Sequence, residues 1–109
     1  MIVVTTETVP GRRARRALGV VRGNTIRARH VGRDILATFR NVFGGEVREY
    51  TKLMAESREQ AIDRMVDEAE RLGADAVVAV RFTTSMIMTA AAEILCFGTA
   101  VVLEEEEGA

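Results

Sequence analysis

The chain is 109 residues long, the usual size of one domain, and 48% of its residues are hydrophobic and 28% charged, with a single proline. This composition is typical of a chain that folds around a core, and it excludes a disordered or low-complexity protein. The sequence offers no run of about 18 apolar residues to span a bilayer, and residues 1–6 lack the basic region of a secretory signal. We therefore expect a cytoplasmic protein that does not contact the membrane.

The net charge of −1 conceals a separation of charge along the chain. Residues 1–45 carry nine arginines and two acids, a balance of +7, whereas residues 46–109 carry six basic and fourteen acidic residues, a balance of −8. Two halves of opposite net charge can make neighbouring copies of the chain attract one another, or the basic half can bind an anion. The sequence leaves open whether the arginine cluster at Arg12–Arg16 lies between subunits or faces a ligand.

The first half of the chain predicts strands followed by a short helix. Residues 2–7 begin with a β-branched run, and the turn signal Pro10-Gly11 follows them, which indicates a first strand. Residues 15–30 mix apolar residues with arginine and are interrupted by two glycines, so we expect one bent strand or two short ones with the arginines toward solvent. Over residues 32–43 the apolar spacing becomes that of a helix, which Gly44-Gly45 is expected to end.

A long amphipathic helix is predicted for residues 46–72. Its apolar residues recur at intervals of three and four with charged residues between them. At about 1.5 Å per residue, the helix would be roughly 40 Å long. The sequence Leu72-Gly73-Ala74-Asp75 is expected to end it, with Gly73 at a positive φ and Asp75 as a turn or capping acid.

Two further strands are predicted, at residues 76–84 and 93–103. They are largely apolar, with few polar residues between the apolar ones, as in strands covered on both faces. Because the helices of one subunit can cover only one face of the sheet, the other face needs a second cover, as do Met86-Ile87-Met88 and Ala90-Ala91-Ala92 in the predicted connection. We therefore expect a homo-oligomer with closed symmetry.

The predicted fold class is thus α+β, with about four main strands, a short helix and a long helix in a single domain over residues 1–104. The run Glu104-Glu105-Glu106-Glu107 is interpreted as solvated, and residues 105–109 are predicted to be an acidic disordered tail.

Several short motifs together carry a resemblance to a known family. They are Ile2-Val3-Val4-Thr5-Thr6, Gly19-Val20-Val21 with Gly23, Gly44-Gly45 followed by Tyr50, Leu72-Gly73-Ala74-Asp75-Ala76-Val77-Val78 and Gly98-Thr99-Ala100-Val101. In order and spacing the chain resembles the YbjQ-like family, small uncharacterised proteins often labelled heavy-metal-binding. The resemblance implies a subunit with the strand and helix arrangement of dodecin, which assembles into a homopentamer that can pair face to face into a decamer.

The metal label of that family finds little support in the residues. Soft and borderline metals are usually held by three or four thiolate or imidazole ligands at definite spacings. This chain has one histidine, His30, and one cysteine, Cys96, far apart in the sequence. Many relatives have acidic residues where this chain has Arg81, Thr83 and Thr84. We assign no metal ligand and no cofactor, and expect Cys96 to be a buried thiol and His30 a solvated strand-end residue, although a ring could gather one ligand from each subunit.

Other functions are weakly indicated. The Gly19 to Gly23 spacing lacks the Lys-Ser/Thr of a phosphate loop, and no nucleophile pair is visible, so we expect no enzyme and assign no catalytic residue. The arginine cluster could bind nucleic acid, but the acidic total and the few aromatic residues argue against it. Two hypotheses stay open: a structural ring-forming assembly module, and a ring that binds a metal or small ligand between subunits, for example near His30 or Met86-Ile87-Met88.

Overall fold

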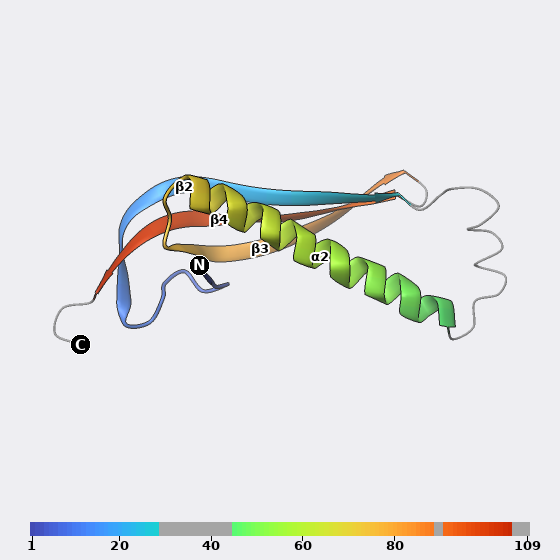
Figure 1. Ribbon diagram of the computed structural model, residues 1–109, viewed down its shortest axis with the longest axis horizontal. Coiled ribbons are helices and arrows are strands. Elements are labelled where there is room, and N and C mark those ends of the chain that lie inside the picture. The colour runs from blue at the N-terminus through green and yellow to red at the C-terminus, as the bar shows by residue number, and fades with distance from the viewer. Residues whose placement is uncertain (29–44, 89–90, 106–109) are drawn as a thin grey trace.

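The computed structural model describes residues 1–28, 45–88 and 91–105, which form an α+β fold (Figure 1). The described elements are, in chain order, β1 (Ile2–Val3), β2 (Arg12–Ala28), α2 (Gly45–Arg71), β3 (Ala76–Met88) and β4 (Ala91–Glu105). The short helix predicted for residues 32–43 lies outside the described residues. The long helix predicted for residues 46–72 is confirmed, with Gly45 as its first residue and Arg71 as its last.

The strands form one mixed sheet in the order β1-β3-β4-β2. β1 pairs in parallel with the start of β3, and β4 is antiparallel to both β3 and β2. The helix α2 lies across one face of this sheet, over β2 and β4, and the N-terminal end of α2 diverges from the strands (Figure 1). β2 and β3 therefore run in the same direction on the two sides of β4.

β2 is one bent strand, which settles the choice that the sequence left open. Its register with β4 shifts between Ala14 and Arg16 and again between Ala17 and Gly19. Gly19 has a φ of 121°, a conformation that side chains rarely adopt, so the second bulge needs a glycine. The two bulges turn the N-terminal end of β2 away from the line of the sheet (Figure 1).

The helix α2 ends in a Schellman motif. Gly73 N donates to Glu70 O at 3.0 Å, and Ala74 N donates to Ala69 O at 3.0 Å, so two of the last helical carbonyls are satisfied. Gly73 has a φ of 82°, which confirms the expectation of a positive φ. Asp75 has a different role from the one expected, because its Oδ2 accepts the Leu103 N–H at 2.8 Å and so ties the end of α2 to β4.

Replacing Gly73 with valine should lower the free energy of unfolding by about 1–2 kcal/mol, because a β-branched residue is strained at positive φ. No heavy atom lies within 4 Å of a Cβ built at Gly73, so the cost comes from the backbone and not from packing. Asparagine tolerates this conformation, and Gly73→Asn is therefore the matched control. Urea denaturation in which both variants unfold at the wild-type midpoint would contradict the assignment.

Each face of the sheet has its own core. Beneath α2 lies a cluster that includes Val21, Met65, Cys96 and Ala100, all fully buried. Ala76, Val78, Val101 and Leu103 form a smaller cluster, and Ile2, Val4 and Val9 pack against it. The N-terminal segment thus covers the second cluster, which corrects the expectation that only another subunit could provide a second cover.

Backbone bonds hold this N-terminal segment along β3. Val4 N donates to Val77 O at 3.0 Å, Val80 N donates to Val4 O at 3.1 Å, and Ala79 N donates to Thr6 O at 2.8 Å. Ala79 has a φ of 53° at the point where the β3–β4 register shifts, between Val78 and Arg81. β1 itself is shorter than the predicted strand 2–7. The residues that follow β1 run along β3 and are joined to it by isolated backbone hydrogen bonds.

The last two strands are longer than predicted. β3 extends beyond its predicted C-terminal end, and β4 extends beyond both of its predicted ends. Met86, Ile87 and Met88 were expected in a connection but are part of β3, and Ala91 and Ala92 are part of β4. Residue 90 lies outside the described residues. Glu105, predicted to begin the disordered tail, is the last residue of β4, and residues 106–109 are again outside the described part.

Candidate functional site

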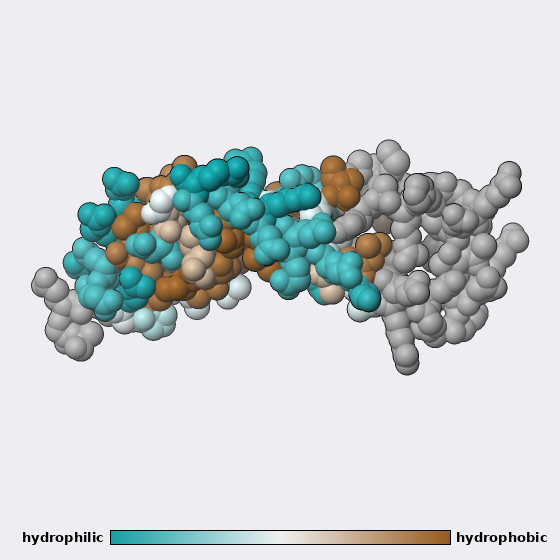
Figure 2. Space-filling model, in the orientation of Figure 1, coloured by the Kyte–Doolittle hydropathy of each residue, from teal (hydrophilic) through white to brown (hydrophobic). Residues whose placement is uncertain are grey.

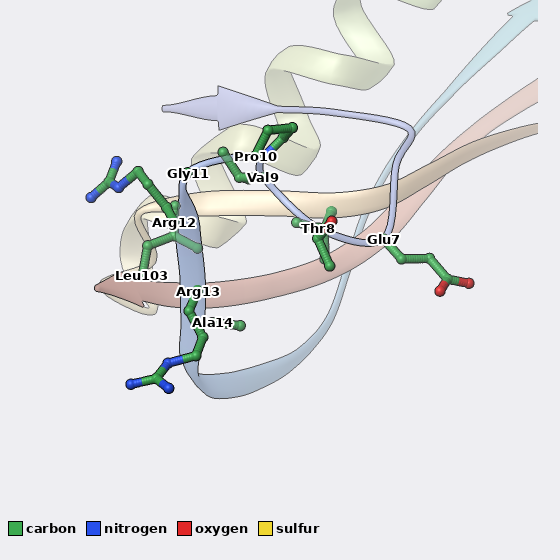
Figure 3. Close-up of a pocket in the computed structure, with 10 residues that line it drawn as sticks. Glu7, Thr8, Val9, Pro10, Gly11, Arg12, Arg13, Ala14 and Leu103 are labelled. Atoms are coloured by element: carbon green, nitrogen blue, oxygen red, sulfur yellow. The ribbon is translucent and has the colours of Figure 1, made fainter. Parts of the chain in front are cut away.

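The segment between β1 and β2 forms a niche. It has a volume of about 210 Å³ and is lined by residues 7–14 with Val78 and Leu103 (Figure 3). Its wall is a type II turn, in which Arg12 N donates to Val9 O at 3.0 Å, Pro10 takes the second position and Gly11 has a φ of 81°. The sequence signal Pro10-Gly11 therefore has a defined structural role.

The niche has an apolar floor and a charged surround. Val78 and Leu103 are buried and belong to the second core cluster. The guanidinium groups of Arg12 and Arg13 and the carboxylate of Glu7 extend away from Val9 and Pro10 (Figure 3). The niche therefore offers an apolar floor with charged residues around it.

Two arginines of the basic cluster pair with acids of the same chain. Arg13 lies opposite Glu104 in the β2–β4 register, and its Nε donates to Glu104 Oε1 at 2.8 Å. Arg12 lies opposite Glu105, with 3.6 Å between Arg12 Nε and Glu105 Oε1. Part of the charge separation seen in the sequence is therefore neutralised inside one subunit. Because both pairs reach the surface, each contributes at most about 1 kcal/mol of stability.

Sequence reasoning missed this pairing because it treated the glutamate run as a tail. The signal was present: arginines at residues 12–13 and glutamates at residues 104–105 lie near the two ends of the chain, and both flank predicted strands. Opposite charges directly across an antiparallel pair stabilise its register. Arg15 and Arg16, the other arginines of the cluster, are exposed on β2.

Cys96 has the structural role expected of it. It is fully buried beneath α2, with its Sγ 3.6 Å from the Sδ of Met65. Burial raises the pKa of the Cys96 thiol, so the sulfur stays protonated and weakly nucleophilic at neutral pH. His30 lies outside the described residues. Among residues 1–28, 45–88 and 91–105, no group of three or more His, Cys, Asp and Glu side chains is placed to hold a metal ion.

Arg81 helps to hold the N-terminal segment. Its Nη1 donates to Thr5 O at 2.8 Å and to Val80 O at 2.9 Å. Thr83 and Thr84 follow it on β3 and are exposed. The structure therefore places these three residues at a surface edge of the sheet.

Comparison with known proteins identifies the family. A family model named YbjQ and described as "Putative heavy-metal-binding" matches residues 1–104. The chain belongs to the YbjQ family. This YbjQ family member is 58% identical to a UPF0145 protein of Archaeoglobus fulgidus over 101 residues, which cover 93% of this chain and 94% of that one. It is 53% identical to a UPF0145 protein of Thermotoga maritima over 105 residues, covering 96% and 99% of the two chains.

A solved structure supports the fold of this YbjQ family member. The crystal structure of a protein of unknown function from Pediococcus pentosaceus, of the DUF74 family, superposes with a TM-score of 0.66 at 12% identity. The match covers 95% of this chain and 98% of the other.

Within the described residues, α2 is too polar to cross a membrane and no other helix there is a candidate to do so.

Proposed function

We propose that this YbjQ family member is a non-catalytic assembly module, the subunit of a closed homo-oligomeric ring. The observation that carries the proposal is the uncovered apolar surface of the sheet. Phe82 and Met86, on the face of the sheet that α2 partly covers, are 42% and 81% exposed, and Val20 and Ile26, on the opposite face, are 60% and 58% exposed. Large exposed apolar side chains on both faces of a sheet favour contact with other protein surfaces.

The shape of the subunit supports the same proposal. Its radius of gyration is 18.1 Å and its extents are 61 × 23 × 17 Å. A compact domain of this length has a radius of gyration of about 13 Å. In Figure 2 a diagonal band of hydrophilic residues on α2 crosses the molecule, and hydrophobic residues of the sheet show beside it. An elongated subunit with a sheet that its own helix only partly covers is suited to packing beside copies of itself.

Thermal unfolding tests the proposal, because association of folded subunits makes the midpoint depend on concentration. We expect the unfolding temperature to rise when the protein concentration is increased a hundredfold. A midpoint that does not move, with the protein at the mass of one chain, 12.0 kDa, would contradict the proposal.

A further inference from the structure

As far as the described strands show, the sheet has two open edges on opposite sides. β2 is the outermost strand on one side. On the other side β1 pairs with β3 only at Ala76 and Val77, and the backbone bonds from residues 4–6 reach no further than Val80. Within the described residues, the outer side of β3 from Arg81 to Met88 has no neighbouring strand. This segment is named the β3 edge below.

The two edges differ in how they are protected. β2 carries six arginines, four of them at residues 12–16, and both of its bulges lie between Ala14 and Gly19, which disfavours pairing of one β2 edge with another. The β3 edge has a single charged residue, Arg81, and it lies at the very start. Two β2 edges would bring arginines together and repel. The β3 edge is therefore the one that is open to strand addition.

Among residues 1–28, 45–88 and 91–105, the β3 edge also lacks a full cover on its helix face. Phe82 lies opposite Cys96 and Met86 lies opposite Ala92 in the β3–β4 register, which places Phe82 and Met86 on the face where Cys96 is buried under α2. Because α2 packs mainly on β2 and β4, Phe82 and Met86 remain 42% and 81% exposed. In the part of the chain that the structure describes, α2 is the one helix, and it leaves Phe82 and Met86 without a full cover.

A second copy of the chain supplies both missing parts. Building on the proposed assembly, we propose that the β3 edge pairs in parallel with the outer edge of β2 in a second copy. β2 and β3 run in the same direction. Head-to-tail joining of copies therefore continues one sheet, in which the face that carries α2 lies on the same side in every copy. The second copy's α2, which lies on its own β2, is then brought beside Phe82 and Met86. Pairing of two β3 edges would instead leave these residues remote from any helix.

The test compares two substitutions of exposed apolar residues by lysine. Met86→Lys places a charge in the proposed contact, whereas Leu72→Lys changes a residue that is 47% exposed at the C-terminal end of α2. By light scattering, we expect Met86→Lys to weaken subunit association at least about tenfold, as loss of a buried apolar anchor does. Leu72→Lys is expected to keep the wild-type mass.

The outcomes separate this inference from the proposed function. A wild-type oligomer that Met86→Lys leaves intact, or that Leu72→Lys dissociates equally, would overturn the β3 edge pairing alone. A monomeric wild type would overturn both. If Met86→Lys fails to fold, hydrogen exchange of the wild-type oligomer decides: protection of every amide from Thr83 to Met88 supports pairing on both sides of β3, and protection of alternate amides only would overturn it.

Discussion

Gly23→Ala is expected to lower the free energy of unfolding by about 2–3 kcal/mol, near the upper end of the cost of overpacking a core. A Cβ at this position would lie 2.1 Å from Ala61 O, 2.4 Å from Met65 N and 2.8 Å from Arg64 Cβ. Two of these three atoms belong to the backbone of α2, so the helix itself would have to move away from β2.

Other contacts resist that movement. Thr25 Oγ1 donates to Ser57 O at 3.1 Å, and an Arg64 guanidinium N–H donates to Asn24 O. Thr25 and Ser57 are buried, so a shift of α2 would leave polar groups unpaired in the core. The expected cost of Gly23→Ala therefore exceeds that of a single displaced side chain.

Asn24→Ala is the control for this prediction, because Asn24 is adjacent in the chain and exposed. Its side chain donates to Glu93 Oε2 at 3.2 Å, and loss of such a surface bond costs about 1 kcal/mol or less. Chemical denaturation at one protein concentration measures both variants. Equal stability of Gly23→Ala and wild type would show that α2 does not approach β2 this closely.

Met65→Ala has the second large expected effect, a loss of about 2–5 kcal/mol, the range for truncation of a buried methionine. Of the side chains whose burial the structure describes, Met65 is the largest that is fully buried, and it lies between α2 and the sheet, against Cys96. Its removal leaves a cavity that the packed strands cannot fill.

Met65→Leu nearly conserves the volume and should cost less than about 1.5 kcal/mol. The difference in unfolding free energy between the two variants therefore measures the cost of the cavity, separately from the cost of replacing the thioether. If calorimetry finds that alanine and leucine at this position are equally tolerated, Met65 does not fill the core beneath α2.

The features that the sequence predicted well are those coded by neighbouring residues. The period of the apolar residues located α2 within a residue of its observed limits, and Gly73 marked its end because the Schellman motif needs a positive φ. Pro10-Gly11 marked a turn for the same local reason.

The features that it missed depend on residues far apart in the chain. The pairing of Arg13 with Glu104 and the cover that Val4 and Val9 give the second core cluster are both set by the sheet topology. The length of β3 could have been inferred, since residues 85–92 contain no glycine, proline, asparagine or aspartate to stop a strand. The niche had no local signal beyond its turn, because its floor comes from β3 and β4.

Sedimentation equilibrium tests the central claim, that this YbjQ family member is a subunit of a homo-oligomer, most directly. The mass of one chain is 12.0 kDa. We expect one species at an integer multiple of that mass, stable to dilution, as closed symmetry requires. A single species at the mass of one chain over the whole concentration range would contradict the account.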